Sequence, residues 1–312
     1  MTPNNNGPDF PLIGSTILQA LPARKSDSHK GDFGVAGILG GAPGMIGAVL
    51  LCARAALHLG AGKVYAASLA DNMTLDILHP ELMWHDPELL LNQQLTVFAV
   101  GPGLGRSERA RYCLDLAMQT EAILLLDADA LNLLAGSQSL KNCLALRSAP
   151  CLLTPHPGEA ALLLGSDTRT VQSDRRAAAL TLAEQYRAYV VLKGAGSICV
   201  SREGEVRINP TGNAGLSSAG TGDVLTGMIA ALLAQGLSPF AALQLAVYLH
   251  GAAADSLLEQ GIGPIGLTAT EVMIEARNLL NRRDRPAALS DKNSARKIKY
   301  DPDSVASQGD SR

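Results

Sequence analysis

Residues 209–236, NPTGNAGLSSAGTGDVLTGMIAALLAQG, place a glycine-rich loop directly before an apolar helix, with one acid, Asp223, at the junction. Gly220 and Gly222 allow backbone N–H groups to turn inward, and the helix adds unpaired amides and the positive end of its dipole. This arrangement predicts an anion hole. The stretch matches neither GxxxxGK[ST] nor GxGxxG, which excludes a P-loop and a Rossmann fingerprint at this position.

An acid beside an anion hole requires an explanation, because a carboxylate and a phosphate repel each other. The acid becomes useful where it takes a proton from a hydroxyl that attacks a phosphoryl group, while the amides stabilise the transferred charge. Asp223 is therefore predicted to serve a phosphoryl-transfer site. The alternative is that Thr221 or Asp223 is an ordinary N-cap of the helix.

Seven short apolar runs precede this loop, separated by helical segments, and they predict buried parallel strands with helices on both faces. The runs cover residues 33–40, 61–69, 95–101, 122–128, 149–155, 189–194 and 197–201. Residues 197–209 alternate and turn at Glu203-Gly204, which predicts a hairpin added to the sheet. Helices are expected over 44–62, 173–189 (capped by Ser173 or Asp174), 221–234, 238–260 and 268–282.

The composition is that of a globular α/β protein, with 47% apolar residues, 31 glycines and a formal net charge of -3. The charge gives no electrostatic footprint for nucleic acid, and no apolar run reaches the roughly 18 residues that span a membrane. The N-terminus lacks a signal-peptide pattern, so we expect a cytoplasmic protein. The five cysteines show no CxxC pairing and are expected to be buried thiols.

The domain organisation follows from the loss of apolar periodicity after about residue 283 and from the absence of any linker or internal repeat before it. Residues 1–10 are expected to be a disordered leader, residues 11–283 one domain, and residues 284–312 a disordered tail.

Several motifs in order resemble the ADP- or ATP-dependent NAD(P)H-hydrate dehydratases, which repair hydrated nicotinamide cofactors and belong to the ribokinase-like superfamily. The motifs are HKGDFG (29–34), GGAPGMIGA (40–48), HPELMW (79–84), GPGLG (101–105), LDADALNLL (126–134), TPHPGEAALLL (154–164), VVLKGAGSICV (190–200) and AGTGDVLTG (219–227). The resemblance implies a ribokinase-like three-layer α/β/α fold with a central, mostly parallel sheet.

The resemblance also implies a role for each motif. Asp223 would be the catalytic base, in contact with substrate together with Ala48, Gly103, Gly105 and His156. The nucleotide would be bound by Lys193, Gly194, Ala195, Gly196, Ser197, Gly220, Thr221 and Gly222. Glu159 would support the metal and water network around the phosphates, Mg²⁺ would accompany the nucleotide, and ADP is expected in preference to ATP; the sequence identifies no metal ligand.

Each of these motifs also has a purely structural interpretation. Thr154 and Glu159 suit helix capping, residues 193–197 suit a hairpin turn, and residues 101–105 suit a strand-to-helix turn. Asp129 is either a helix cap or a polar group near the site. His58, His79, His85 and His250 are expected to be structural or surface residues, and Ala42 stands where the resembled family often has serine, which removes any hydroxyl contact there.

The function expected from these residues is nucleotide-driven dehydration of the 6S hydrates of NADH and NADPH. A small-molecule kinase, for example of a vitamin precursor, would share Asp223, but His156 stands where such kinases carry asparagine. A third alternative, a nucleotide-binding regulator without activity, has no need of a base. The resemblance implies a homo-oligomer, a tetramer, and the partner epimerase is expected on a separate chain.

Overall fold

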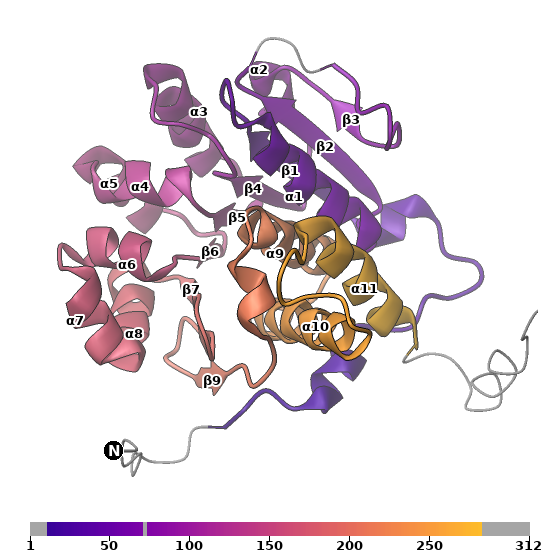
Figure 1. The fold of residues 1–312 in the computed structure, drawn as a ribbon. Helices are drawn as coiled ribbons and strands as arrows, with labels where there is room; N and C mark the ends of the chain where they lie inside the picture. Colours follow the sequence, from indigo (N-terminus) through magenta and orange to yellow (C-terminus); the bar gives the residue numbers. More distant parts are fainter. Residues whose placement is uncertain (1–10, 71–73, 283–312) are drawn as a thin grey trace, which may run out of the picture.

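The fold is a central β-sheet covered by helices on both faces. The computed structural model describes residues 11–70 and 74–282, and Figure 1 shows their α/β/α layering. The expected leader (1–10) and the expected tail (284–312) lie outside the described residues, and the domain limits at 11 and 283 stay predictions. In the part of the chain that is described, none of the helices is long and apolar enough to cross a membrane.

The sheet has nine strands in the order β3-β2-β1-β4-β5-β6-β7-β8-β9. The strands are β1 (Val35–Gly40), β2 (Lys63–Ser68), β3 (Met83–Trp84), β4 (Val97–Val100), β5 (Ile123–Leu126), β6 (Cys151–Leu153), β7 (Tyr189–Leu192), β8 (Ile198–Val200) and β9 (Val206–Ile208). Strands β1 to β7 pair in parallel, and β8 and β9 are antiparallel to their neighbours. The predicted mostly parallel sheet is thus confirmed, as are its seven predicted strands and the β8–β9 hairpin, whereas β3 was not predicted.

The two faces of the sheet carry different helices. One face packs against α1 (Ile46–His58), α9 (Thr221–Ala234), α10 (Pro239–Glu259) and α11 (Ala269–Arg282). The other packs against α2 (Pro87–Leu90), α3 (Glu108–Met118), α4 (Asp129–Ala135), α5 (Gln138–Ala145), α6 (Pro157–Leu164), α7 (Thr168–Ser173) and α8 (Arg175–Tyr186). Successive strand residues alternate between the two cores, as Ile38 and Leu39 do, because side chains along a strand point to opposite faces.

Short 3₁₀ helices complete the described chain: η1 (Ser15–Ala20), η2 (Lys30–Phe33) and η3 (Ala214–Ser217). The cap predicted for the helix at 173–189 is Asp174, whose carboxylate accepts from the Ala177 amide; Ser173 instead ends α7. Four of the five cysteines are buried as expected, and Cys143 is only half-buried.

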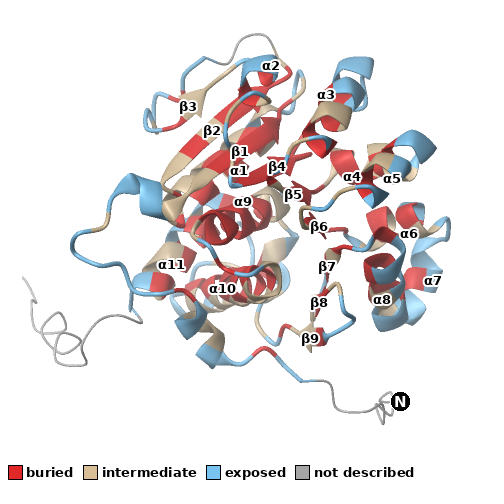
Figure 2. Cartoon of the chain, turned by 180° about the vertical axis from the view of Figure 1, so that it is seen from behind, coloured by how far each residue is buried: buried red, intermediate tan, exposed pale blue. Residues whose placement is uncertain are grey.

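Helix α9 is the most enclosed helix and carries the glycine loop at its N-terminus. Every residue from Val224 to Ala234 is buried, and the helix packs against both α1 and α10. Figure 2 shows the strands and α9 as largely buried. A helix that is apolar on all sides must be buried on all sides. The position of α9 is therefore determined by core packing around its whole circumference.

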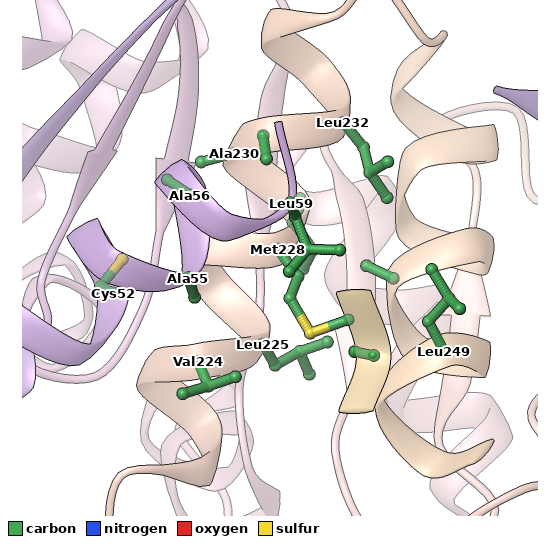
Figure 3. Packing of buried hydrophobic residues seen from close by; sticks show 14 of the residues in the cluster. Cys52, Ala55, Ala56, Leu59, Val224, Leu225, Met228, Ala230, Leu232 and Leu249 are labelled. Carbon is green, nitrogen blue, oxygen red and sulfur yellow. The ribbon is translucent and has the colours of Figure 1, made fainter. Parts of the chain in front are cut away.

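The contact between α9 and α1 depends on Gly227. A Cβ built on Gly227 would lie 2.1 Å from the carbonyl oxygen of Cys52. Figure 3 shows the surrounding packing, with Cys52 and Ala55 of α1 beside Val224 and Met228 of α9. Since the backbone of α1 occupies the space a side chain would need, only glycine permits this separation of the helices.

We expect Gly227→Ala to lower the free energy of unfolding by roughly 1–3 kcal/mol or more, the cost of overpacking a closed core. Urea denaturation of the full chain measures this change. Gly47→Ala in α1 is the control, because a Cβ there meets nothing within 4 Å, and its stability should be unchanged or higher. Equal stability of both variants with the parent protein would contradict the packing described for Gly227.

Candidate functional site

The predicted site residues gather at the carboxyl edge of the sheet. The loops that follow β1, β4, β5, β6 and β7 meet there, together with the N-terminus of α9. The strand order places β2 on one side of β1 and β4 on the other, so the chain leaves β1 and β4 in opposite directions. Such a switch point at the carboxyl ends of parallel strands is where open α/β sheets bind ligands.

Asp127, at the end of β5, is the centre of the site, and its carboxylate is 1% exposed. Its Oδ1 lies 2.8 Å from the Lys193 ammonium and accepts a hydrogen bond of 2.9 Å from the Thr154 hydroxyl. Its Oδ2 accepts a hydrogen bond of 2.7 Å from the Thr226 hydroxyl. One buried carboxylate therefore joins β5 to β6, β7 and α9. No role was predicted for Asp127 from the sequence, and Thr154 is part of this network rather than a helix cap.

Asp223 lies in the first turn of α9 but does not cap it. The N-cap is Gly220, at φ 84°, and the helix has no side-chain cap. Among the described residues no hydrogen bond is found to the Asp223 carboxylate. The N-cap interpretation of Asp223 is therefore wrong, and the same holds for Thr221, whose hydroxyl is shared between the carbonyl oxygens of Leu216 and Ser218.

The surroundings of Asp223 raise the pKa of its carboxyl group. Burial raises the pKa of Asp223 to about 7, the negative charge of Asp127 adds to the shift, and the Lys193 ammonium opposes it. A carboxyl group that ionises near neutral pH accepts a proton effectively under working conditions. The free carboxylate and the raised pKa are the properties required of a general base.

The glycines before α9 differ in their roles. Gly220 has a left-handed backbone, and a Cβ there would meet the Leu51 side chain at 2.4 Å. Gly222 is helical, and a Cβ there would lie 3.6 Å from the Lys193 ammonium nitrogen, an ordinary contact distance. The absence of a side chain at Gly222 leaves the ammonium close to the amides of the first turn, which have no helical partners.

His156 is the N-cap of α6 and faces Glu159. Its Nδ1 accepts from the amides of Gly158 and Glu159, at 3.0 and 3.2 Å, and its backbone N–H donates to Glu159 Oε2 at 2.8 Å. Because Nδ1 is an acceptor, a neutral ring carries its proton on Nε2, which lies 3.2 Å from Glu159 Oε1. The predicted capping by Glu159 is present, but its partner is His156 and not Thr154.

The pKa values of His156 and Glu159 are both shifted so that the neutral form of each side chain is favoured. Burial and the Lys193 charge lower the pKa of His156. Burial also raises the pKa of Glu159 to about 7, against the charge of Lys193. The His156 side chain is 56% exposed, so its ring remains accessible to a ligand.

Residues 193–197 connect the antiparallel strands β7 and β8, which confirms the hairpin predicted for them. Gly194 and Gly196 have φ angles of 142° and 62°, and the Ser197 hydroxyl donates to the Gly194 carbonyl at 3.0 Å. Burial disfavours the Lys193 ammonium, but the charges of Asp127 and Glu159 outweigh it and raise the pKa of Lys193. The ammonium is therefore held charged at the centre of the site.

The loops after β1 and β4 contact each other through their backbones. The Gly41 amide donates to the Pro102 carbonyl at 2.9 Å, and the Ala42 amide donates to the Gly103 carbonyl at 2.6 Å. At Gly103, φ is 58°, and a Cβ would lie 3.0 Å from the Ala48 Cβ. The structure thus brings Ala48 and Gly103 together at the switch point.

Gly105 and Asp129 form the outer part of the same region. The Gly105 amide donates to Asp129 Oδ2 at 2.9 Å, and a Cβ on Gly105 would lie 3.0 Å from the Ala42 Cβ. Asp129 is the first residue of α4 and not its cap, which is Ala128. Of the two interpretations offered for Asp129, the polar role near the site is the one observed.

The histidines that were expected to be structural or surface residues do not take part in this site. His58 and His79 contact each other through their Nε2 atoms at 3.1 Å. His58 is the last residue of α1, at the opposite end of that helix from the glycine loop that precedes it. His250 is buried in α10 with a hydrogen bond to the Thr221 backbone, and burial lowers its pKa to about 4. Its predicted structural role is confirmed.

The donor set fits a magnesium ion that arrives with phosphate. Over the described residues, no group of three or more His, Cys, Asp or Glu side chains forms a metal site. Asp127 is fully engaged by Lys193, Thr154 and Thr226, whereas Glu159 is buried, accepts a hydrogen bond from the His156 amide and has its pKa raised. Mg²⁺ commonly binds through one or two carboxylates, water and substrate phosphates, which these residues permit.

Comparison with known proteins identifies a family for most of the chain. The family described as NAD(P)H-hydrate dehydratase matches residues 36–276. The ADP-dependent (S)-NAD(P)H-hydrate dehydratase of Neisseria meningitidis is 43% identical over 290 residues, covering 88% of this chain and 98% of that protein. The bifunctional NAD(P)H-hydrate repair enzyme Nnr of Escherichia coli is 39% identical over 84% of this chain, which spans 50% of that longer protein.

Solved structures agree with the sequence comparison. The ADP/ATP-dependent NAD(P)H-hydrate dehydratase of Bacillus subtilis, co-crystallised with ATP/Mg²⁺, superposes with a TM-score of 0.77 at 30% identity, covering 89% of this chain and 99% of that one. The hydroxyethylthiazole kinase of Pyrococcus horikoshii, at 16% identity and a TM-score of 0.58, shares the fold alone.

The raised pKa of Asp223 predicts a pH-dependent cost to stability. The folded protein favours the protonated carboxyl of Asp223. Its contribution to the free energy of unfolding is therefore fully present below the ordinary pKa near 4 and is lost as pH rises through about 7. Asparagine mimics the neutral form, so Asp223→Asn should raise the melting temperature at pH 8 by at least ~3 °C, and the gain should shrink as pH falls to 5.

Thermal unfolding of the protein without ligands at pH 8, 7, 6 and 5 measures this difference. Asp86→Asn is the matched control, because Asp86 is exposed and makes no side-chain cap at the start of α2. A gain for Asp223→Asn that is absent at pH 8, or equal at every pH, would contradict the shifted ionisation.

Proposed function

The chain belongs to the NAD(P)H-hydrate dehydratase family, and from this membership we propose that it restores NADH and NADPH from their 6S hydrates with a nucleotide as phosphoryl donor. The observation that carries the proposal is the free, half-buried carboxylate of Asp223, with its pKa raised to about 7, on the first turn of α9. It lies in the field of the Lys193 ammonium, which Asp127 holds at 2.8 Å.

The proposed reaction has two stages. Asp223 takes the proton of the ring hydroxyl as its oxygen forms a bond to the terminal phosphorus, and the shortened nucleotide leaves. The carbon–oxygen bond then breaks, with the electron pair going to the phosphate and the ring nitrogen's lone pair forming a C=N bond. Loss of a proton from the neighbouring ring carbon restores the dihydropyridine, so a poor leaving group has been replaced by a good one.

The chain's own residues position the two substrates in this proposal. Lys193, with 19% of its side chain exposed, would contact phosphate, and residues 194–197 the rest of the nucleotide. The backbone of Gly220, Thr221 and Gly222 would stabilise the transferred group. Ala48 and Gly103, together with Gly105 and His156, would bind the hydrated ring; the first two contact each other at the switch point.

Magnesium, when bound, neutralises the phosphate charge, and Glu159 is the residue proposed to hold its water network. The co-crystallisation of the Bacillus subtilis relative with ATP/Mg²⁺ supports a nucleotide that carries magnesium. ADP is proposed as the preferred donor, in line with the ADP dependence for which the Neisseria meningitidis relative is named.

The kinase alternative is weaker, since the relatives at 43% and 39% identity are both named for hydrate repair and the kinase likeness shows the fold alone. Bifunctional relatives combine two activities in one chain about twice as long as the matched region. That the epimerase is on a separate chain, that the protein is a tetramer and that it is cytoplasmic remain proposals based on the sequence.

The test mixes the full chain, Mg²⁺ and NADH hydrate with ADP or with ATP, and follows the return of reduced-nicotinamide absorbance. We expect recovery of NADH with one inorganic phosphate released per molecule restored, and faster recovery with ADP. The proposal fails if neither nucleotide restores NADH, or if the phosphoryl group remains on a stable organic product, as a kinase would leave it.

A further inference from the structure

Arg175, the first residue of α8, holds the loop that connects β7 to β8. Its guanidinium donates to the carbonyl oxygens of Leu192 at 3.2 Å, Lys193 at 3.3 Å and Ala195. The cap Asp174 fixes the start of α8, since its carboxylate accepts from the Ala177 amide at 2.9 Å. A side chain from one helix therefore determines the backbone path of a loop about twenty residues further along the chain.

The loop is shaped around this guanidinium. A Cβ on Gly194 would lie 2.9 Å from Nη2 of Arg175, so the glycine is needed for space as well as for its φ of 142°. On the adjoining side, the Ser197 hydroxyl donates to the Gly194 carbonyl, and the Lys193 amide donates to the Pro155 carbonyl at 2.9 Å. The loop is held at several points, and Arg175 contributes three of them.

The direction of these carbonyls decides where the amides point. In a trans peptide the C=O of one residue and the N–H of the next point to opposite sides. Because the carbonyls of Lys193 and Ala195 face Arg175, the N–H groups of Gly194 and Gly196 face away from it. Within the described chain, neither of these two amides has a hydrogen-bond acceptor.

Arg175 also brings a charge that no carboxylate cancels. Among the described residues it forms no ion pair, burial alone lowers its pKa, and its Nε is buried without a hydrogen-bond partner. A half-buried guanidinium with only carbonyl partners keeps a net positive charge behind the loop.

From this geometry we propose that Arg175 is a positioning residue for the nucleotide: it orients the Gly194 and Gly196 amides toward oxygen or nitrogen acceptors of the bound nucleotide and places a positive charge behind them. The inference rests on the proposed role of residues 193–197 in nucleotide binding. Arg175 itself need not touch the ligand, because it acts through the backbone of the loop.

The test compares Arg175→Met with Arg175→Lys in the full chain. Methionine removes both the charge and the hydrogen bonds, whereas lysine keeps the charge but cannot span three carbonyls as a planar guanidinium does. Arg169→Met is the matched control, since Arg169 is exposed on the neighbouring helix α7.

Three readouts are measured: ADP affinity by calorimetry, the KM for NADH hydrate with kcat, and amide hydrogen exchange of residues 194–197 without ligand. For Arg175→Met we expect ADP affinity to fall ~10-fold or more, faster exchange of the loop amides, and little change in the KM for the hydrate. Arg175→Lys should recover only a minor part of the affinity, and Arg169→Met should match the parent protein.

Parent-like ADP affinity in Arg175→Met would overturn the inference, as would an equal loss of affinity for ADP and hydrate. Full recovery by lysine with parent-like exchange would also overturn it, because charge alone would then explain the effect. If Arg175→Met does not fold, Arg175→Gln decides, since glutamine keeps a polar side chain but neither the charge nor the reach to three carbonyls, and parent-like ADP affinity in it would overturn the inference. A parent protein that binds ADP but restores no NADH would refute the proposed function while leaving these readouts decisive for Arg175.

Discussion

The buried carboxylate of Asp127 is the constraint on which the site depends. A charge that is 1% exposed is stable only when it is paired and hydrogen-bonded, and Asp127 is satisfied by the Lys193 ammonium and the hydroxyls of Thr154 and Thr226. These partners come from β6, β7 and α9, so the energetic requirement of one buried group fixes the relative positions of three elements. The loops after β6 and β7 and the loop before α9 are the ones proposed to bind phosphate and hydrated ring.

The same carboxylate helps to explain how an acid functions next to an anion hole. Burial and the charge of Asp127 raise the pKa of Asp223 to about 7, while Lys193 limits the shift. Asp223 is thus poised to accept a proton, and the raised pKa also favours its neutral form before the nucleotide binds, which lessens its repulsion of an approaching phosphate. The enclosure of α9 between α1 and α10 maintains this environment, because the helix cannot move without opening the core.

The sequence predicted the structure correctly where the pattern lies in consecutive residues. Glycine-bounded apolar runs predicted seven strands, and the loop at 220–222 predicted both the helix 221–234 and the special position of Asp223. Contacts between residues distant in the sequence produce no pattern that can be recognised in it. Asp127 contacts partners 27, 66 and 99 residues away, and Arg175 of α8 contacts the loop between β7 and β8. His156 was not recognised as the cap of α6 for a different reason, because an imidazole acts as an acceptor at that position only in one tautomer, here with Glu159 beside its Nε2.

The most direct test of the account is the single-turnover rate of Asp223→Asn, measured together with its affinity for ADP on the same folded protein. Asparagine keeps the size of the side chain but cannot accept the proton. We expect a rate lower by roughly 10²–10⁴-fold, with ADP bound as tightly as before or more tightly because a negative charge has been removed. A folded variant that turns over at nearly the parent rate would contradict the role of Asp223 as the base.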